Sequence, residues 1–178
     1  MATSVWSQVV DALVDAMRAQ SGCRAPGADA DEDLVLVLDG PEVWLTEEPA
    51  PLLLIVGGAG DDDDEPGVSG QSRATATGAR SRDEVGAITC SAIAQCGGIM
   101  LPDATLVVPP PTIRSLRAQA FGVMALVETV LRASPTLGFS SVQHMDVQVG
   151  SRIVVQQYLA DDGAVCSVVF TVDYSARI

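Results

Sequence analysis

The sequence predicts an α+β fold: a single domain over residues 1–178 in which two helices pack on a mostly antiparallel β-sheet of about four to five strands. Three observations predict it. Apolar residues recur every three or four positions over residues 112–133, as on a helix that lies against a flat surface. Apolar and polar residues alternate over residues 143–149 and 165–174, as in strands with one buried face. Between them, residues 160–163 have the sequence Ala-Asp-Asp-Gly, which is typical of a hairpin turn.

The long helix is expected to end at residue 133. Ser134 precedes Pro135, and the residue before a proline avoids the α conformation. Charged and polar residues fall mostly between the apolar positions, so one stripe of the helix faces the sheet. The stripe comprises Ile113, Leu116, Ala120, Met124, Val127 and Leu131.

The N-terminal half supplies the other helix and the first strands. Residues 4–20 carry an apolar stripe, which predicts an amphipathic helix. The stripe comprises Trp6, Val9, Val10, Leu13, Val14 and Met17. Residues 34–38 predict a short strand, and residues 43–45 are expected to pair back on it. The continuous apolar run at residues 52–56 predicts a buried central strand, and residues 84–96 predict a strand with small residues on its inner face.

Residues 57–83 show neither a helical nor a strand period. The segment is rich in glycine and aspartate, begins with acidic residues and ends with arginines. We expect a long mobile loop here, because a segment of this composition buries too little apolar surface to fold on its own. A loop of this length inside a compact domain is usually functional or disordered.

The net charge of −13 is concentrated in one segment. Residues 28–65 contain 13 Asp and Glu and no Lys or Arg, whereas the rest of the chain carries 10 acidic residues and 10 Arg. Binding to free DNA or RNA is disfavoured, because it requires a cationic surface. No apolar run reaches the roughly 18–20 residues that span a bilayer, and the first residues lack the pattern of a secretion signal. We expect no membrane partner and a chain that folds in a cytoplasm.

Patterns for cofactors and metals are weak. The Gly-Gly-Ala-Gly sequence at residues 57–60 follows a strand, as in nucleotide-binding turns, but four aspartates follow it in place of a helix. The acidic run at residues 61–65 lacks the spaced carboxylates of a calcium loop. The cysteines lack the close pairs of a zinc site and are expected to be small buried hydrophobic residues; they are Cys23, Cys90, Cys96 and Cys166.

Patterns for catalysis are equally weak. His144 is the one histidine, and it shares a strand face with Asp146, as a surface or interface residue commonly does. No serine lies in a Gly-x-Ser-x-Gly turn, and no cysteine has a base marked beside it by sequence. The sequence therefore predicts no catalytic, cofactor or metal site, and a protein that is not an enzyme.

A set of packing residues runs from the long helix to the C-terminus: Arg117, Ala120, Val127, Glu128, Leu131, Arg132, Leu137, Gly138, Val142, Val147, Tyr158, Asp162, Gly163, Ala164, Val168, Phe170, Val172, Ala176 and Arg177. With these residues the chain resembles the tail terminator proteins of long-tailed (siphovirus-type) bacteriophages, especially those that infect actinobacteria. The upstream order of elements is also similar, with Asp39-Gly40 at the first strand turn and residues 84–96 as the third strand.

The resemblance implies a structural virion protein of the phage tail and neck, in a virion assembled in the cytoplasm of the host bacterium. It implies a homohexameric ring at the head-proximal end of the tail, which stops tail-tube polymerisation and joins the tail to the head. The implied partners are further copies of the chain, the tail tube protein and the head–tail stopper or connector protein. Genomic DNA would pass through the bore without specific binding.

DNA must slide through such a bore without adhering, and an acidic lining repels phosphate. The candidate lumen or partner-contact loop is therefore Asp61, Asp62, Asp63, Asp64 and Glu65. The simpler interpretation of the same run is a solvated acidic loop.

Two alternatives to the terminator stay open. One is another phage neck or tail-completion protein of similar fold. The other is a small cytoplasmic α+β domain that binds a ligand or catalyses a reaction. Six-fold rings of purified protein, or overlong tails in a deletion phage, favour the terminator, whereas a monomer with a deep apolar pocket favours the small domain.

Overall fold

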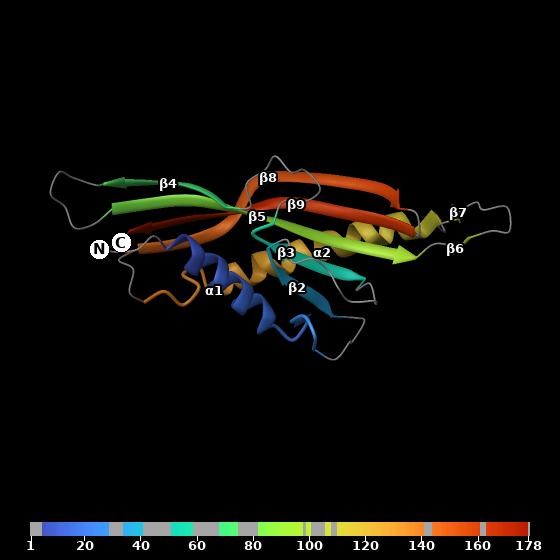
Figure 1. The fold of residues 1–178 in the computed structure, drawn as a ribbon, viewed down its shortest axis with the longest axis horizontal. Coiled ribbons are helices and arrows are strands. Elements are labelled where there is room, and N and C mark those ends of the chain that lie inside the picture. Colours follow the sequence, from blue (N-terminus) through green and yellow to red (C-terminus); the bar gives the residue numbers. More distant parts are fainter. Residues whose placement is uncertain are drawn as a thin grey trace.

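The computed structural model of the chain describes residues 5–28, 34–40, 51–58, 68–74, 82–97, 99–100, 106–107, 110–140, 144–160 and 163–177. Two helices and nine strands follow one another in these residues (Figure 1). They are α1 (Trp6–Arg18), β1 (Cys23–Arg24), β2 (Val35–Asp39), β3 (Leu52–Val56), β4 (Val68–Ala74), β5 (Arg82–Gly97), β6 (Ile99–Met100), β7 (Leu106–Val107), α2 (Pro110–Ala133), β8 (His144–Ala160) and β9 (Gly163–Arg177).

Seven of the strands form one mixed sheet, in the order β1-β2-β3-β5-β9-β8, with β4 paired to the part of β5 that β3 leaves uncovered. The pairs β1–β2 and β2–β3 are parallel, and the other pairs of this sheet are antiparallel. The α+β class and the mostly antiparallel sheet are as predicted, but the expected four to five strands were too few. The sequence also did not predict that β2 and β3 are parallel to each other, because side chains alternate in the same way in parallel and antiparallel strands.

Three long strands give the molecule its elongated shape, with β5, β9 and β8 side by side along most of its length (Figure 1). Ala160 pairs with Gly163, so β8 and β9 form the predicted hairpin, although its two turn residues lie outside the described part of the chain. Strand β8 extends well beyond the segment at 143–149 that alternation predicts, to Ala160, whereas β9 extends only slightly beyond the predicted segment at 165–174. Backbone pairing continues through residues whose side chains break the alternation.

Both helices pack on one face of the sheet and share a single core. The predicted stripe of α1 is confirmed, with Val9, Leu13 and Met17 fully buried against β2 and β3. The prediction for α2 is wrong at Ile113, which is 39% exposed. The buried side of α2 instead includes Val123 and Val130, because the helix is rotated slightly on the sheet compared with the predicted stripe.

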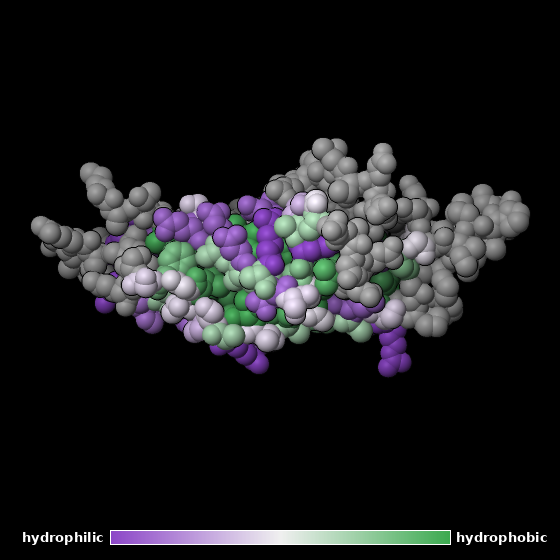
Figure 2. All heavy atoms as spheres, turned by 90° about the horizontal axis from the view of Figure 1, so that it is seen from below, coloured by the Kyte–Doolittle hydropathy of each residue, from purple (hydrophilic) through white to green (hydrophobic). Residues whose placement is uncertain are grey.

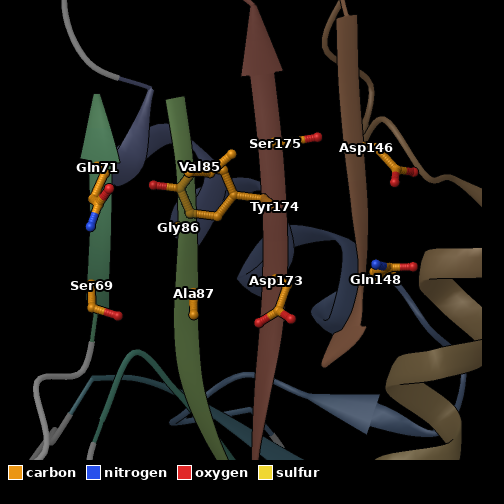
Figure 3. Close-up of a pocket in the computed structure, with 10 residues that line it drawn as sticks. All are labelled: Ser69, Gln71, Val85, Gly86, Ala87, Asp146, Gln148, Asp173, Tyr174 and Ser175. Carbon is orange, nitrogen blue, oxygen red and sulfur yellow. The ribbon is translucent and has the colours of Figure 1, made fainter. Parts of the chain in front are cut away.

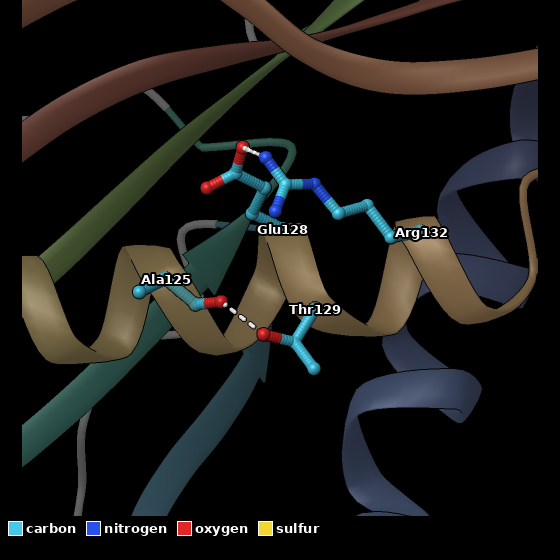
Figure 4. Close-up of polar contacts among 4 residues, drawn as sticks. All are labelled: Ala125, Glu128, Thr129 and Arg132. Atoms are coloured by element: carbon cyan, nitrogen blue, oxygen red, sulfur yellow. Dashed lines mark hydrogen bonds and ion pairs between the residues drawn. The ribbon is translucent and has the colours of Figure 1, made fainter.

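The solvent-facing side of α2 carries the polar residues expected between the apolar positions (Figure 4). Arg132 donates to Glu128 across one helical turn at 2.6 Å, and the Thr129 hydroxyl donates to the carbonyl of Ala125 at 2.8 Å. The helix ends at Ala133, directly before Ser134 and Pro135, as predicted. Among the described residues, no helix is long and apolar enough to cross a membrane.

A second, smaller apolar cluster lies on the other face of the sheet. Leu36, Leu38 and Leu53 are buried there, and Ile55 and Ile93 pack against them. The sheet is therefore apolar on both faces where β2, β3 and the C-terminal half of β5 meet. This explains why residues 52–56 are a continuous apolar run, as expected of the central strand that β3 is.

The segment at residues 57–83, predicted to be one long loop, contains strand β4, and β5 already begins at Arg82. Strand β4 was missed because its sequence, VSGQSRA, is polar and small and shows no apolar alternation. It is held by a register of seven backbone pairs with β5, from Val68↔Ile88 to Ala74↔Arg82. Residues 43–45, expected to pair back on the first strand, and the acidic run 61–65 lie outside the described residues.

Candidate assembly surface

The outer edge of β8 is one border of the sheet. Strand β8 pairs with β9 on one side, and no further described strand pairs with it on the other. Near its start this outer edge is partly covered, because the Val147 N–H donates to the carbonyl of Pro135 at 3.0 Å, in the turn that follows α2. The second half of the strand lies beyond this contact.

Exposed apolar side chains are concentrated on that second half. Of the eight large apolar residues exposed in the described part of the chain, five lie between residues 153 and 159 of β8, and Leu159 is 64% exposed. We call this stretch the apolar edge; its exposed large apolar residues are Ile153, Val154, Val155, Tyr158 and Leu159. Clustering of this kind on a protein surface marks an interaction site more often than scattered single residues do.

The apolar edge presents large side chains on both faces of the sheet. Ile153 and Val155 stand opposite Phe170 and Val168 of β9, on the face that carries the helices. Val154 stands opposite Val169, on the other face. The sequence from Ile153 to Ala160 contains no charged residue, whereas the first half of β8 carries His144, Asp146 and Arg152. Charged side chains usually protect an edge strand from pairing with strands of other molecules. In β8 such side chains are present only before the apolar edge.

A bulge separates the two halves of β8. Val149 pairs with Val172 and Ile153 pairs with Phe170, so residues 150–152 all face the single residue Thr171. Because the insertion adds two residues, the alternation of faces is the same on both sides of it. A Cβ at Gly150 would collide with the Thr171 hydroxyl and the Asp173 carboxylate, so a larger residue there would require these two side chains to move.

A small apolar hollow of about 260 Å³ adjoins the apolar edge. It lies between the start of α2, the end of β8 and the start of β9. Ile113 and Leu116 line it from the helix, and Leu159 and Val165 line it from the strands. The exposure of Ile113 is explained by this hollow, because the sheet side chains do not reach over it. The apolar surface thus continues from the edge strand onto the helix face.

The opposite end of the long strands is charged. Asp83, Arg177 and His144 are direct neighbours across β5, β9 and β8. The Arg177 guanidinium donates to both oxygens of Asp83, at 2.8 and 3.3 Å. This hydrogen bond, with the positive charge of Arg177, holds the pKa of Asp83 below its ordinary value. His144 and Asp146 are both exposed, consistent with a surface position on β8.

A shallow polar groove of about 550 Å³ crosses the face of the sheet opposite the helices (Figure 3). Ser69 and Gln71 of β4 line one side, and Asp146 and Gln148 of β8 line the other, with Asp173 between them. Within the described residues, no three His, Cys, Asp or Glu side chains gather closely enough to hold a metal ion. The groove is thus lined mainly by groups that can form hydrogen bonds.

The four cysteines are free thiols. Cys23, Cys90 and Cys166 are buried, which confirms the prediction for them, while Cys96 is half-buried. Burial raises the pKa of the Cys90 thiol to about 12 and raises the pKa of Cys23 as well. Thiols of this kind remain protonated at neutral pH and serve as core residues.

The apolar edge contains none of the predicted site residues, and of its exposed apolar residues only Tyr158 belongs to the set that carries the resemblance. The predicted loop Asp61–Glu65 lies outside the described residues. The signal that was overlooked is the uncharged run from Ile153 to Ala160, which becomes informative once β8 is known to be a border strand. Neither known protein-family models nor curated proteins match the chain.

Seen from the side of α1 and β2, hydrophobic and hydrophilic residues are mixed over the middle of the surface (Figure 2). This is the side of the molecule that lies away from β8 in Figure 1.

Proposed function

We propose that the chain is a structural protein of a bacteriophage virion, the tail terminator, rather than an enzyme. Copies of the chain form a ring at the head-proximal end of the tail, stop the growth of the tail tube and join the tail to the stopper protein of the neck. The observation that carries the proposal is the apolar edge: an uncharged stretch in the second half of a border strand, with exposed large apolar side chains on both faces of the sheet.

A border strand of this kind supports side-by-side assembly. Its backbone offers a template for another strand, and its side chains lose water contact when that strand is added. When each copy contacts the next through two different surfaces, the array closes into a ring if the rotation between copies divides the circle. A closed ring leaves no end to which further copies can add. These are the physical properties that a cap on a polymerising tube requires.

The negative charge of the chain supports a ring through which DNA passes. The net charge is −13, and the acidic residues are concentrated between residues 28 and 65. In the proposed ring, Asp61, Asp62, Asp63, Asp64 and Glu65 line the bore or its rim, where negative charge repels the phosphates of the passing genome. The ring is built in the host cytoplasm and remains in the neck of the virion.

The proposal is tested in a phage that carries this gene. Deleting the gene should give tails of uncontrolled length that lack heads, as seen by electron microscopy. Complementation with the Val155→Asp variant should fail, whereas Ser151→Asp, which adds the same charge at an exposed position of the bulge, should restore normal tails. Tails of normal length in the deletion phage would exclude the terminator role, and headless tails of normal length would favour another neck protein.

A further inference from the structure

We propose that strand β4 of a second copy of the chain adds to the apolar edge of β8, so that one sheet continues from copy to copy around the ring. The closure of the array into a ring rests on the proposed function. The contact between two copies does not, because we infer it from the two borders of the sheet.

The sheet has different border strands on its two sides. β8 forms one border, while β4 and β1 lie on the other. Pairing β8 with β8 of a second copy would use the same surface twice and would stop at a two-fold dimer. Pairing β8 with a strand from the other border leaves each copy with one strand to donate and one to accept. Only this second arrangement continues from copy to copy.

The lengths of the strands select β4 over β1. The apolar edge runs from residue 153 to 159, and β4, Val68–Ala74, has 7 residues, the same number as this stretch. β1 has only 2 residues and would leave most of the apolar edge uncovered. Within the described residues, β4 pairs only with β5, so its other side is a border as well.

The positions of the two strands fit a head-to-tail contact. In Figure 1, β4 lies at one end of the elongated molecule, and the C-terminal part of β8 lies toward the other end. One neighbouring copy can therefore bind at β4 while another copy binds at β8. The backbone pairs of an added strand contribute to binding, as the seven backbone pairs between β4 and β5 do within the chain.

Composition also suits this pairing. β4 contains Ser69, Gly70 and Ser72, and small residues on one strand leave room for the bulky side chains of the strand beside it. Neither β4 nor the apolar edge contains a carboxylate. In a chain with a net charge of −13, this contact therefore brings no acidic side chains of the two strands together.

The test uses one cysteine on each strand. Gln71 stands opposite Val85 and Gln156 stands opposite Ser167, so both lie on the face of the sheet away from the helices. The variant Gln71→Cys/Gln156→Cys is made with Cys96→Ser, which removes the half-buried native thiol, and is treated after assembly with a short bismaleimide. We expect a ladder of cross-linked multimers on a denaturing gel, whereas each single cysteine variant stays monomeric.

Two results would overturn the inference. A dimer from the Gln156→Cys variant alone would show that β8 pairs with itself. Only monomers from the double variant, in protein that assembles, would show that another surface makes the contact. The proposed function fails separately: a ladder together with tails of normal length in the deletion phage would refute the terminator role and leave the strand contact in place.

Discussion

The side chain of Glu84 caps helix α1 from 79 positions away in the sequence: its Oε2 accepts a hydrogen bond from the backbone N–H of Val5 at 3.1 Å. Helix α1 has no side-chain cap of its own, and Val5 is its N-cap residue. Glu84 is 1% exposed and also forms an ion pair with Arg82, Nη2 to Oε1, at 3.1 Å. A carboxylate at this place satisfies a helix N–H and interacts favourably with the positive end of the helix dipole.

Replacing Glu84 should therefore destabilise the fold. Glu84→Ala removes the acceptor for Val5 and the partner of Arg82, and we expect the free energy of unfolding to fall by about 2 kcal/mol. The control is Glu128→Ala, which breaks an exposed ion pair within α2 (Figure 4) and should change the free energy of unfolding by no more than about 0.5 kcal/mol. Chemical denaturation measures both, and equal effects would argue against the capping role.

Two glycines should respond in opposite ways to alanine. A Cβ at Gly86 would lie 2.6 Å from the carbonyl oxygen of Ser69 and 2.6 Å from the hydroxyl of Tyr174, so Gly86→Ala must displace backbone and should destabilise the protein. A Cβ at Gly122, inside α2, meets nothing within 4 Å. Gly122→Ala should stabilise the protein by about 0.5–1 kcal/mol, because alanine favours the helix interior. Thermal unfolding of the pair gives the comparison, and a stabilising Gly86→Ala would contradict the close approach.

Stability should fall in alkaline solution because of Tyr174. Burial, with the nearby charge of Glu84, raises the pKa of its hydroxyl from 10.0 to about 12. Between these values the unfolded chain binds fewer protons than the folded chain, so the stabilisation is full below pH 10 and is lost as the pH rises toward 12. At about pH 11 the loss should be about 1 kcal/mol.

Tyrosinate absorbance gives the measurement. The chain has 2 tyrosines, so a Tyr158→Phe background leaves Tyr174 as the one signal. The titration midpoint should lie well above 10, and Tyr174→Phe should remove this part of the alkaline loss of stability. Ionisation of Tyr174 at its ordinary pKa would show that its ring is accessible to water.

Thiol reactivity should follow burial. Cys96 is half-buried and the other three cysteines are buried, and reaction with a disulfide reagent requires an accessible thiolate. In native protein at neutral pH we expect reaction at Cys96 alone, and reaction of all four thiols after denaturation. Cys96→Ser should abolish the native reaction. Fast native reaction of Cys90 would contradict its place in the core.

The helices could be predicted from the sequence because their apolar period is strong. Val9, Leu13 and Met17 in α1 are buried as expected. The prediction that Ile113 is buried was wrong, because an apolar stripe defines the buried face of a helix only to within part of a turn. Ile113 lines the hollow beside Leu159 and is exposed there. The strand at 68–74 could not be predicted, because backbone pairing with β5 holds it and its side chains leave no pattern.

The candidate surface could not be predicted for a different reason. Ile153, Val154 and Val155 are typical of a strand buried on both faces, and only the order of strands shows that β8 is a border. Strand order depends on contacts between distant parts of the chain. Val172, for example, lies between Ile88 of β5 and Val149 of β8 in the sheet, and such contacts are not visible in a local pattern.

The size of purified assemblies tests the account most directly. Electron microscopy and mass measurement should show closed rings for the wild-type chain, monomers for Val155→Asp, and rings again for Ser151→Asp. In the first variant a charge stands on the apolar edge, and in the second the same charge stands in the bulge beside it. A wild-type chain that stays monomeric at high concentration, or a Val155→Asp variant that forms rings like the wild type, would contradict the claim that the apolar edge of β8 joins one copy to the next.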